Sequence, residues 1–223
     1  ERAVARLGGR KVRTGDFPVL FEATLAGGLL GSLVHAASGG ALYRKASFLI
    51  DHLGKRVLPD FVNISERPHI RCGLGSAPFD SDGVATRERK VVSGGILQGY
   101  FLSAYTARKL GLQTTGNAGG SHNLIIDPGE LDLDGLLRKM SRGLLVTELL
   151  GQGVNYVTGD YSRGAAGYWV ENGSIAYPVE EITIAGNLKA MLAGIVAVGN
   201  DVLVRGSKQT GSILVDRMTV AGE

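Results

Sequence analysis

Glycine content is the feature of this sequence that most constrains its fold. Glycine accounts for 34 of the 223 residues, roughly twice its average frequency in proteins. The chain has only 6 prolines and no Gly-X-Y repeat, which excludes a collagen helix and a proline-rich linker. Because 44% of the residues are hydrophobic, the chain can bury a core. The glycines therefore indicate turns, bulges and places where two backbones approach closely.

Charge and cysteine usage narrow the class of protein. The net charge is +3 and is spread along the chain, and aromatic residues make up 6%, so a mixed solvated surface is favoured over nucleic-acid binding. The single cysteine, Cys72, cannot form an internal disulfide, which fits a reducing compartment. No stretch approaches ~18 consecutive apolar residues, so we expect a cytoplasmic protein that does not enter the membrane.

The hydrophobic pattern predicts an α+β fold with a mainly antiparallel, glycine-rich sheet or barrel-like core and a few packed helices. The clearest hairpin is predicted over residues 168–179, because Asn172-Gly173 suits a type I′ turn. A second hairpin is predicted over 90–102, with its tip at 93–95. Further strands are predicted over 17–21, 61–65, 123–126, 144–149 and 213–220. Helices are predicted over 24–35, 103–110, 132–142 and 187–197.

The predicted helix over 24–35 is unusual because it contains Gly27, Gly28 and Gly31. Each glycine weakens an isolated helix by roughly 1 kcal/mol relative to alanine. We therefore expect another element to pack very closely against this helix. Thr24 is the predicted N-cap.

Common catalytic motifs are incomplete in this sequence. Residues 206–211 have the spacing of a phosphate-binding loop, but Ser212 follows where the motif requires lysine. Residues 160–164 resemble the Gly-x-Ser-x-Gly elbow of serine hydrolases, but Asp160 replaces the first glycine. A turn and a polar loop are the favoured interpretations of these two segments.

The histidines do not form a recognisable metal motif. All four are scattered, with no pair at the i, i+4 spacing that would place both on one helix face: His35, His52, His69 and His122. His35 lies on the predicted glycine-rich helix, and no glutamate follows it as a general base. Convergence of His35, His122 and Asp160 in three dimensions stays open as an alternative.

Four ordered segments carry a resemblance to a known family. They are residues 103–111, 116–120, 158–167 and 177–188, which read SAYTARKLG, GNAGG, TGDYSRGAAG and YPVEEITIAGNL. In combination they resemble the TldD/PmbA family over nearly the whole chain, and most of all its PmbA (TldE) type. The resemblance implies a single domain over residues 1–223 that corresponds to the family's C-terminal domain. Since the sequence begins with glutamate rather than methionine, we expect an N-terminal region to be absent from it.

The family resemblance implies a cytosolic bacterial or archaeal metalloprotease built from two related subunits. In the TldD type a helix carries His-Glu-x-x-x-His, and a cysteine near the C-terminus completes the metal site. The matching positions here are His35, Ala36 and Gly40, and residues 205–211 contain no cysteine. A hydrolytic zinc site needs several ligands and a nearby base, so we expect this chain to bind no metal. Zinc is expected in a TldD-type partner.

Three functions follow as hypotheses. The first is a non-catalytic subunit that shapes the cavity in which a TldD-type partner cleaves unstructured peptides. The second is an independent peptidase with a cryptic metal site, and the third is a modulator of DNA gyrase, for which the sequence shows no nucleic-acid motif. Self-association stays open beside the heterodimer. The polar residues that we expect to face the cavity, each with a capping or turn role as the alternative, are His35, Ser38, Asn117, His122, Asp160, Ser162 and Arg163.

Overall fold

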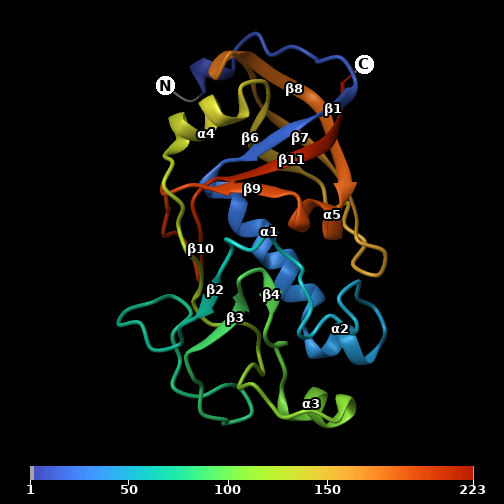
Figure 1. Ribbon diagram of the computed structural model, residues 1–223, viewed down its shortest axis with the longest axis vertical. Coiled ribbons are helices and arrows are strands. Elements are labelled where there is room, and N and C mark those ends of the chain that lie inside the picture. Colours follow the sequence, from blue (N-terminus) through green and yellow to red (C-terminus); the bar gives the residue numbers. More distant parts are fainter. Residues whose placement is uncertain (1–2, 223) are drawn as a thin grey trace.

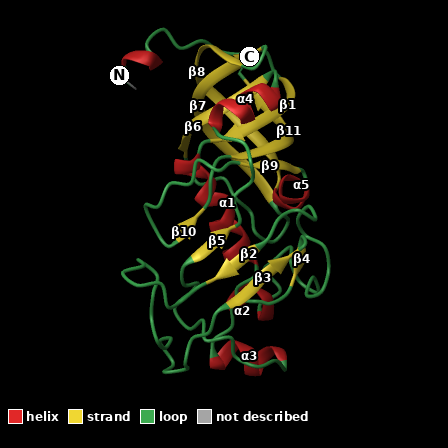
Figure 2. Cartoon of the chain, turned by 60° about the vertical axis from the view of Figure 1, so that its left-hand side comes forward, coloured by secondary structure: helices red, strands yellow, loops and turns green. Residues whose placement is uncertain are grey.

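The larger of two β-sheets forms one end of the molecule, the smaller sheet lies near the middle beside a long helix, and loops with a short helix form the other end (Figures 1 and 2). The computed structural model describes residues 3–222. The long helix is α1 (Ala23–Ala36). Both ends of the chain lie beside the larger sheet, at the top of Figure 1.

The larger sheet closes on itself into a barrel of five strands, because β11 pairs with β1 at the end of the order β1-β6-β7-β8-β11. A sixth strand, β9, extends it by pairing with β11. Only β1 and β6 are parallel, and the other neighbours are antiparallel. The strands are β1 (Gly15–Phe21), β6 (Gly143–Leu150), β7 (Asp160–Glu171), β8 (Ser174–Asn187), β9 (Ile195–Val198) and β11 (Ile213–Ala221). The α+β class with a mainly antiparallel, barrel-like core is therefore confirmed.

The smaller sheet has the order β10-β5-β2-β3-β4 and is antiparallel except between β10 and β5. Its strands are β2 (Ile64–Glu66), β3 (Arg89–Ser93), β4 (Ile96–Leu97), β5 (Leu124–Ile126) and β10 (Lys208–Gln209). The short helices are η1 (Val4–Arg6), α2 (Gly39–Tyr43), α3 (Ala104–Leu110), α4 (Leu133–Met140) and α5 (Leu188–Ala193).

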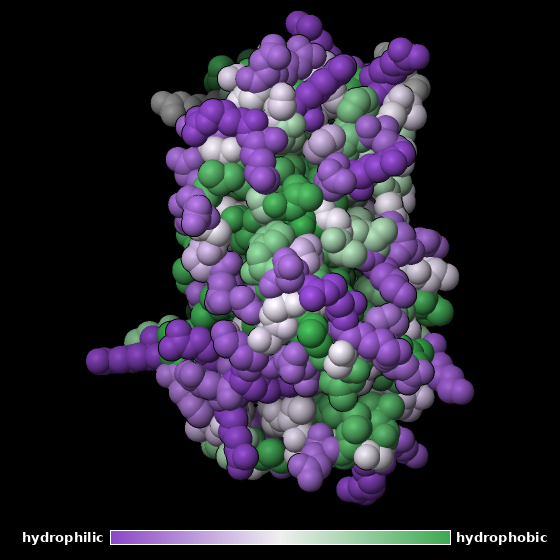
Figure 3. Space-filling view, in the orientation of Figure 1, coloured by the Kyte–Doolittle hydropathy of each residue, from purple (hydrophilic) through white to green (hydrophobic). Residues whose placement is uncertain are grey.

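Helix α1 joins the two sheets through one continuous apolar core. Its Leu30 and Leu33 are buried together with Ile64 and Ile126 of the smaller sheet and with Ile213 of the barrel. On the outside of the barrel, α4 covers a second, smaller cluster with its own apolar residues. The face drawn in Figure 3 is a mixture of hydrophilic residues and smaller hydrophobic patches, as the even spread of charge predicts.

Several local predictions are confirmed. The hairpin of β7 and β8 turns at Asn172 and Gly173, whose φ angles of 51° and 74° are those of a type I′ turn. The helix predicted over 103–110 is α3, which Ser103 caps by accepting the Thr106 N–H and which Gly111 ends in the left-handed conformation. The predicted hairpin of the smaller sheet turns between β3 and β4.

Three local predictions are wrong. The helix that starts after Asn187 ends at Ala193, and the apolar residues that follow it form β9 because they pair with β11. Glu22, rather than Thr24, is the N-cap of α1, and the Thr24 hydroxyl donates to the Glu22 carboxylate at 2.6 Å. Residues 160–163 are the first residues of β7 rather than a polar loop.

Within residues 3–222, every helix is too short or too polar to cross a lipid bilayer.

Candidate functional site

A cavity of about 500 Å³ lies between α1 and one end of the barrel. Helix α1, strands β1, β6 and β7 and the loop between β6 and β7 supply its walls. The lining residues are Phe21, Leu25, Gly28, Leu29, Gly31, Ser32, His35, Leu149, Gly151, Gln152, Val154, Tyr156, Tyr161 and Arg163. Two of the residues predicted to face a cavity, His35 and Arg163, are among them.

Between the larger side chains of Leu25, Leu29 and His35, the face of α1 that lines the cavity carries only Gly28, Gly31 and Ser32. Residues three and four apart share one face of a helix, so Gly28, Gly31, Ser32 and His35 point the same way. A Cβ atom built on Gly28 would meet no heavy atom within 4 Å, and one built on Gly31 would meet only the Lys208 side chain, at 3.9 Å. Gly27 does meet a neighbour, since a Cβ built there would lie 3.7 Å from the Lys208 backbone oxygen of β10, but the predicted close packing is not found at Gly28 and Gly31. Their missing side chains leave open space instead.

Strand β7 directs Arg163 and Tyr161 into the cavity because alternate residues of a strand share one face. The Nε atom of Arg163 is buried and has no hydrogen-bond partner among residues 3–222. Burial raises the pKa of the Tyr161 hydroxyl, and the neighbouring guanidinium of Arg163 offsets only part of that rise. Tyr161 therefore keeps its proton at neutral pH and can donate a hydrogen bond.

His35 projects from the last turn of α1, and its ring packs against Tyr156 with the ring centroids 3.9 Å apart. Ala36 is fully buried, and Gly40 offers no side chain; a Cβ built there would lie 3.6 Å from the Arg44 guanidinium. Zinc needs three or four converging ligands, so these residues do not fit a hydrolytic zinc site.

The cryptic metal site is not formed by the described residues either. Among residues 3–222, His, Cys, Asp and Glu side chains form no group of three or more that could hold a metal ion. Asp160 bonds locally, accepting from the Thr158 hydroxyl at 2.6 Å. The convergence of His35, His122 and Asp160 therefore does not occur within residues 3–222.

The remaining predicted residues lie outside the cavity. Ser162 is exposed and lies on the opposite face of β7 from Arg163. Ser38 is the N-cap of α2 and accepts the Ala41 N–H. Asn117 and His122 belong to a different group of polar residues, centred on Glu66 in the smaller sheet.

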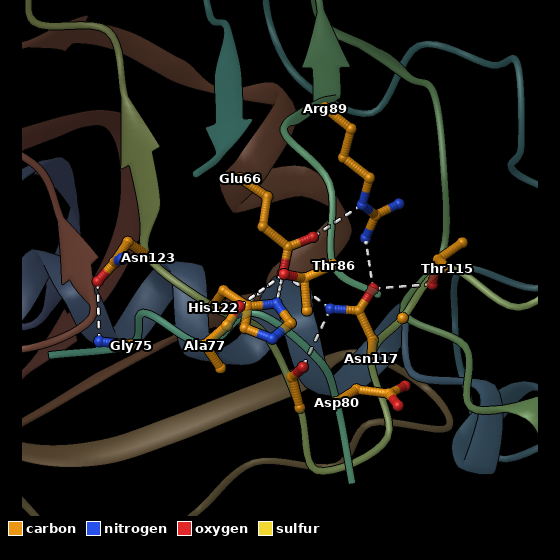
Figure 4. A network of polar contacts seen from close by, with 12 residues as sticks. Glu66, Gly75, Ala77, Asp80, Thr86, Arg89, Thr115, Asn117, His122 and Asn123 are labelled. Carbon is orange, nitrogen blue, oxygen red and sulfur yellow. Dashed lines mark hydrogen bonds and ion pairs between the residues drawn. The ribbon is translucent and has the colours of Figure 1, made fainter. Parts of the chain in front are cut away.

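This second group, which we call the Glu66 cluster, consists of Glu66, Arg89, Asn117 and His122 (Figure 4). Glu66 and Arg89 are direct partners across β2 and β3, and their side chains form an ion pair at 2.7 Å. The Glu66 Oε1 atom also accepts the Asn117 side-chain amide at 2.8 Å, the His122 backbone N–H at 2.8 Å and His122 Nδ1 at 3.1 Å. Because the carboxylate only accepts, Nδ1 carries the proton.

Asn117 uses all of its bonding capacity in the cluster. Its side-chain oxygen accepts from Arg89 and from the Thr115 hydroxyl, and its amide donates to the Gly120 carbonyl as well as to Glu66. A hollow of about 590 Å³ lies beside the cluster, but the Glu66 side chain is only 2% exposed. The geometry therefore favours a structural role, in which the cluster fastens the glycine-rich loop 116–120 to the smaller sheet.

Comparison with known proteins supports a family assignment. Residues 14–222 match the model of the PmbA/TldA metallopeptidase C-terminal domain. The chain is 54% identical over 223 residues to a metalloprotease PmbA homolog of Haemophilus influenzae, which covers 100% of this chain and 49% of that protein. The chain therefore spans about half the length of the curated relatives it matches.

Solved structures show the same fold. A candidate modulator of DNA gyrase from Bacteroides thetaiotaomicron matches with a TM-score of 0.94 and 32% identity, over 100% of this chain and 50% of that one. TldE from Thermococcus kodakarensis matches with a TM-score of 0.85 and 24% identity, over 99% of this chain and 54% of that one.

Proposed function

Because the chain belongs to the PmbA/TldD family, and matches its C-terminal domain, we propose that it is the subunit of a two-subunit peptidase that binds no metal. In this proposal a TldD-type partner supplies zinc and the chemistry of hydrolysis. This chain supplies part of the cavity that holds unstructured peptides. Its compartment is the cytoplasm, which the exposed free thiol of Cys72 fits.

The observation that carries the proposal is the state of the α1 cavity. His35 lines the cavity at the position that matches the first metal ligand of the TldD type. The positions of the base and the second ligand hold Ala36, which is buried, and Gly40, which has no side chain. Metal-assisted hydrolysis requires both the ligands and a group that takes a proton from water. In this proposal the cavity holds the peptide and the partner subunit cleaves it.

Metal analysis and a reconstitution assay test the proposal together. We expect well below one zinc atom per chain after dialysis against trace zinc, measured by elemental mass spectrometry. We also expect hydrolysis of an unstructured fluorogenic peptide only when a TldD-type subunit is added. Stoichiometric zinc in the purified protein, or peptide hydrolysis by the protein alone, would contradict the proposal.

A role in DNA topology is the competing function, and it comes from the names of two solved relatives, from Bacteroides thetaiotaomicron and Thermotoga maritima. Our proposal gives this chain no part in supercoiling. A gyrase assay with and without the protein separates the two functions: a change in the rate of supercoiling at stoichiometric amounts would favour the competing one.

A further inference from the structure

The α1 cavity contains a cationic side chain, Arg163, whose guanidinium contacts the Tyr161 hydroxyl but whose buried Nε has no partner among the described residues. Arg163 is the one permanently charged side chain among the described residues that line the cavity, and none of them is a carboxylate. Its buried Nε lacks a partner within residues 3–222, whereas the large majority of buried polar side-chain atoms in proteins have one. The cavity thus offers a guanidinium without the anion that such a group normally binds.

The floor of the cavity is also unusual. Gly28 is exposed in the middle of α1, where alanine would stabilise the helix and would meet no neighbour within 4 Å. Packing inside this chain therefore does not account for the glycine. A second backbone lying against Gly28 and Gly31 does account for it, because only a surface without side chains allows such close approach.

We propose that Arg163 binds a carboxylate group of an extended peptide whose backbone lies against Gly28 and Gly31. The inference rests on the function proposed above and names the chemical group that the cavity selects. The flat fork of a guanidinium matches the two oxygens of a carboxylate, so the two groups can form a pair of parallel hydrogen bonds. Tyr161, which lies on the same face of β7 as Arg163, is a second donor for the same carboxylate.

A peptide offers a carboxylate from two sources, its C-terminus and its acidic side chains. Binding to the metal-free protein is therefore measured with three dye-labelled peptides of one neutral sequence. The first has a free C-terminus, the second is amidated, and the third is amidated and contains one glutamate. Fluorescence anisotropy gives each dissociation constant. We expect the peptide with the selected carboxylate to bind about ten- to hundredfold more tightly than the amidated neutral one.

The peptide that gains affinity identifies the source. Tighter binding of the first peptide indicates the C-terminal carboxylate, and tighter binding of the third indicates an acidic side chain. Equal affinity for all three peptides, or no binding of any of them, would overturn the inference.

Variants of Arg163 test the residue itself. Arg163→Gln is expected to remove the preference for a carboxylate, and Arg163→Lys to retain only part of it because a lysine lacks the fork. Arg87→Gln removes a charge from an exposed position outside the cavity and is expected to change nothing. Thermal unfolding shows whether each variant is folded. A carboxylate preference that survives in folded Arg163→Gln would also overturn the inference.

The outcomes separate this inference from the proposed function. Metal content and partner-dependent hydrolysis do not involve Arg163, so they can support the subunit role while the peptide series gives equal affinities. In that case only the inference fails. Stoichiometric zinc in the purified protein would end the proposed function, whatever the peptide series shows.

Discussion

The Glu66 cluster and the α1 cavity both place an arginine beside polar neighbours, but they differ in how its donors are satisfied. Arg89 bonds to Glu66, to Asn117 and to the Tyr100 carbonyl. Arg163 leaves a buried Nε without a partner within the described residues. A fully bonded buried network specifies a fold, whereas an unpaired donor beside open space points to a ligand. This difference distinguishes a structural arginine from a binding one.

The largest expected effect on stability concerns the Glu66 cluster, in which the arginine is fully bonded. Glu66→Ala removes the partner of a buried charge and leaves donors of Arg89, Asn117 and His122 unsatisfied. We expect the free energy of unfolding to fall by about 3–5 kcal/mol, measured by urea denaturation. Arg163→Gln in the same experiment is expected to change it by less than about 1 kcal/mol, since it loses only the contact with the Tyr161 hydroxyl and breaks no ion pair among the described residues. Equal losses in the two variants would remove the distinction.

The second prediction extends the comparison to glycines. In β7, a Cβ atom on Gly167 would come within 1.9 Å of the Leu145 carbonyl oxygen, so Gly167→Ala forces two backbones apart. We expect a loss of about 1–3 kcal/mol in the free energy of unfolding. Thermal unfolding monitored by circular dichroism measures it. An unchanged midpoint of thermal unfolding would mean that strands β6 and β7 move apart here without loss of stability.

The third prediction has the opposite sign. Gly28→Ala adds a methyl group to a helix at a place with no neighbour, and is expected to stabilise the protein by about 0.5–1 kcal/mol. The same methyl group enters the cavity and is expected to weaken peptide binding. Gly40→Ala, in α2 and outside the cavity, is the matched control and should leave the affinity unchanged. Tighter peptide binding by Gly28→Ala would contradict the proposed backbone contact.

The sequence predicts elements whose signals are local. Asn172-Gly173 specifies its turn through positive φ angles, and Asn187 caps α5 through its own side chain. The apolar residues from Ile195 to Ala197 continue the pattern of α5 and are therefore predicted as helix, but pairing with β11 makes them part of strand β9. Pairing between distant strands is not a local property, and periodicity alone does not detect it.

The same distinction applies to the two polar sites. His35 is predictable because it is part of a recognisable helix. Arg163 is predicted to face a cavity together with Ser162. That the two side chains lie on opposite faces becomes clear only once β7 is known to be a strand. The pairing of Glu66 with Arg89 depends on the register of two strands whose residues are 23 apart, and no sequence spacing indicates it.

The smallest expected effect concerns Asp80, which lies beside the Glu66 cluster (Figure 4). Burial alone would raise the pKa of this carboxyl, but the backbone N–H groups of Ala118, Val84 and Asp82 donate to it and hold its pKa below the ordinary value. A group whose pKa is depressed by folding stabilises the protein above its unfolded pKa. That stabilisation is lost as the pH falls through the folded value.

Asp80→Asn keeps the shape of the side chain, removes its charge and replaces one acceptor oxygen by an NH2 group, so at least one of the three N–H groups loses its acceptor. We expect the difference in unfolding free energy between the native protein and Asp80→Asn to be constant at neutral pH and to shrink below about pH 4, where the carboxyl of the unfolded chain gains a proton before that of the folded protein does. Urea denaturation at a series of pH values measures the difference. Asp80 accepts the Ala118 N–H of loop 116–120, the loop that Asn117 also holds. A difference that stays constant down to pH 2 would mean that the charge of Asp80 does not help to hold this loop in place. The contrast with the α1 cavity would then depend on the Glu66 ion pair alone.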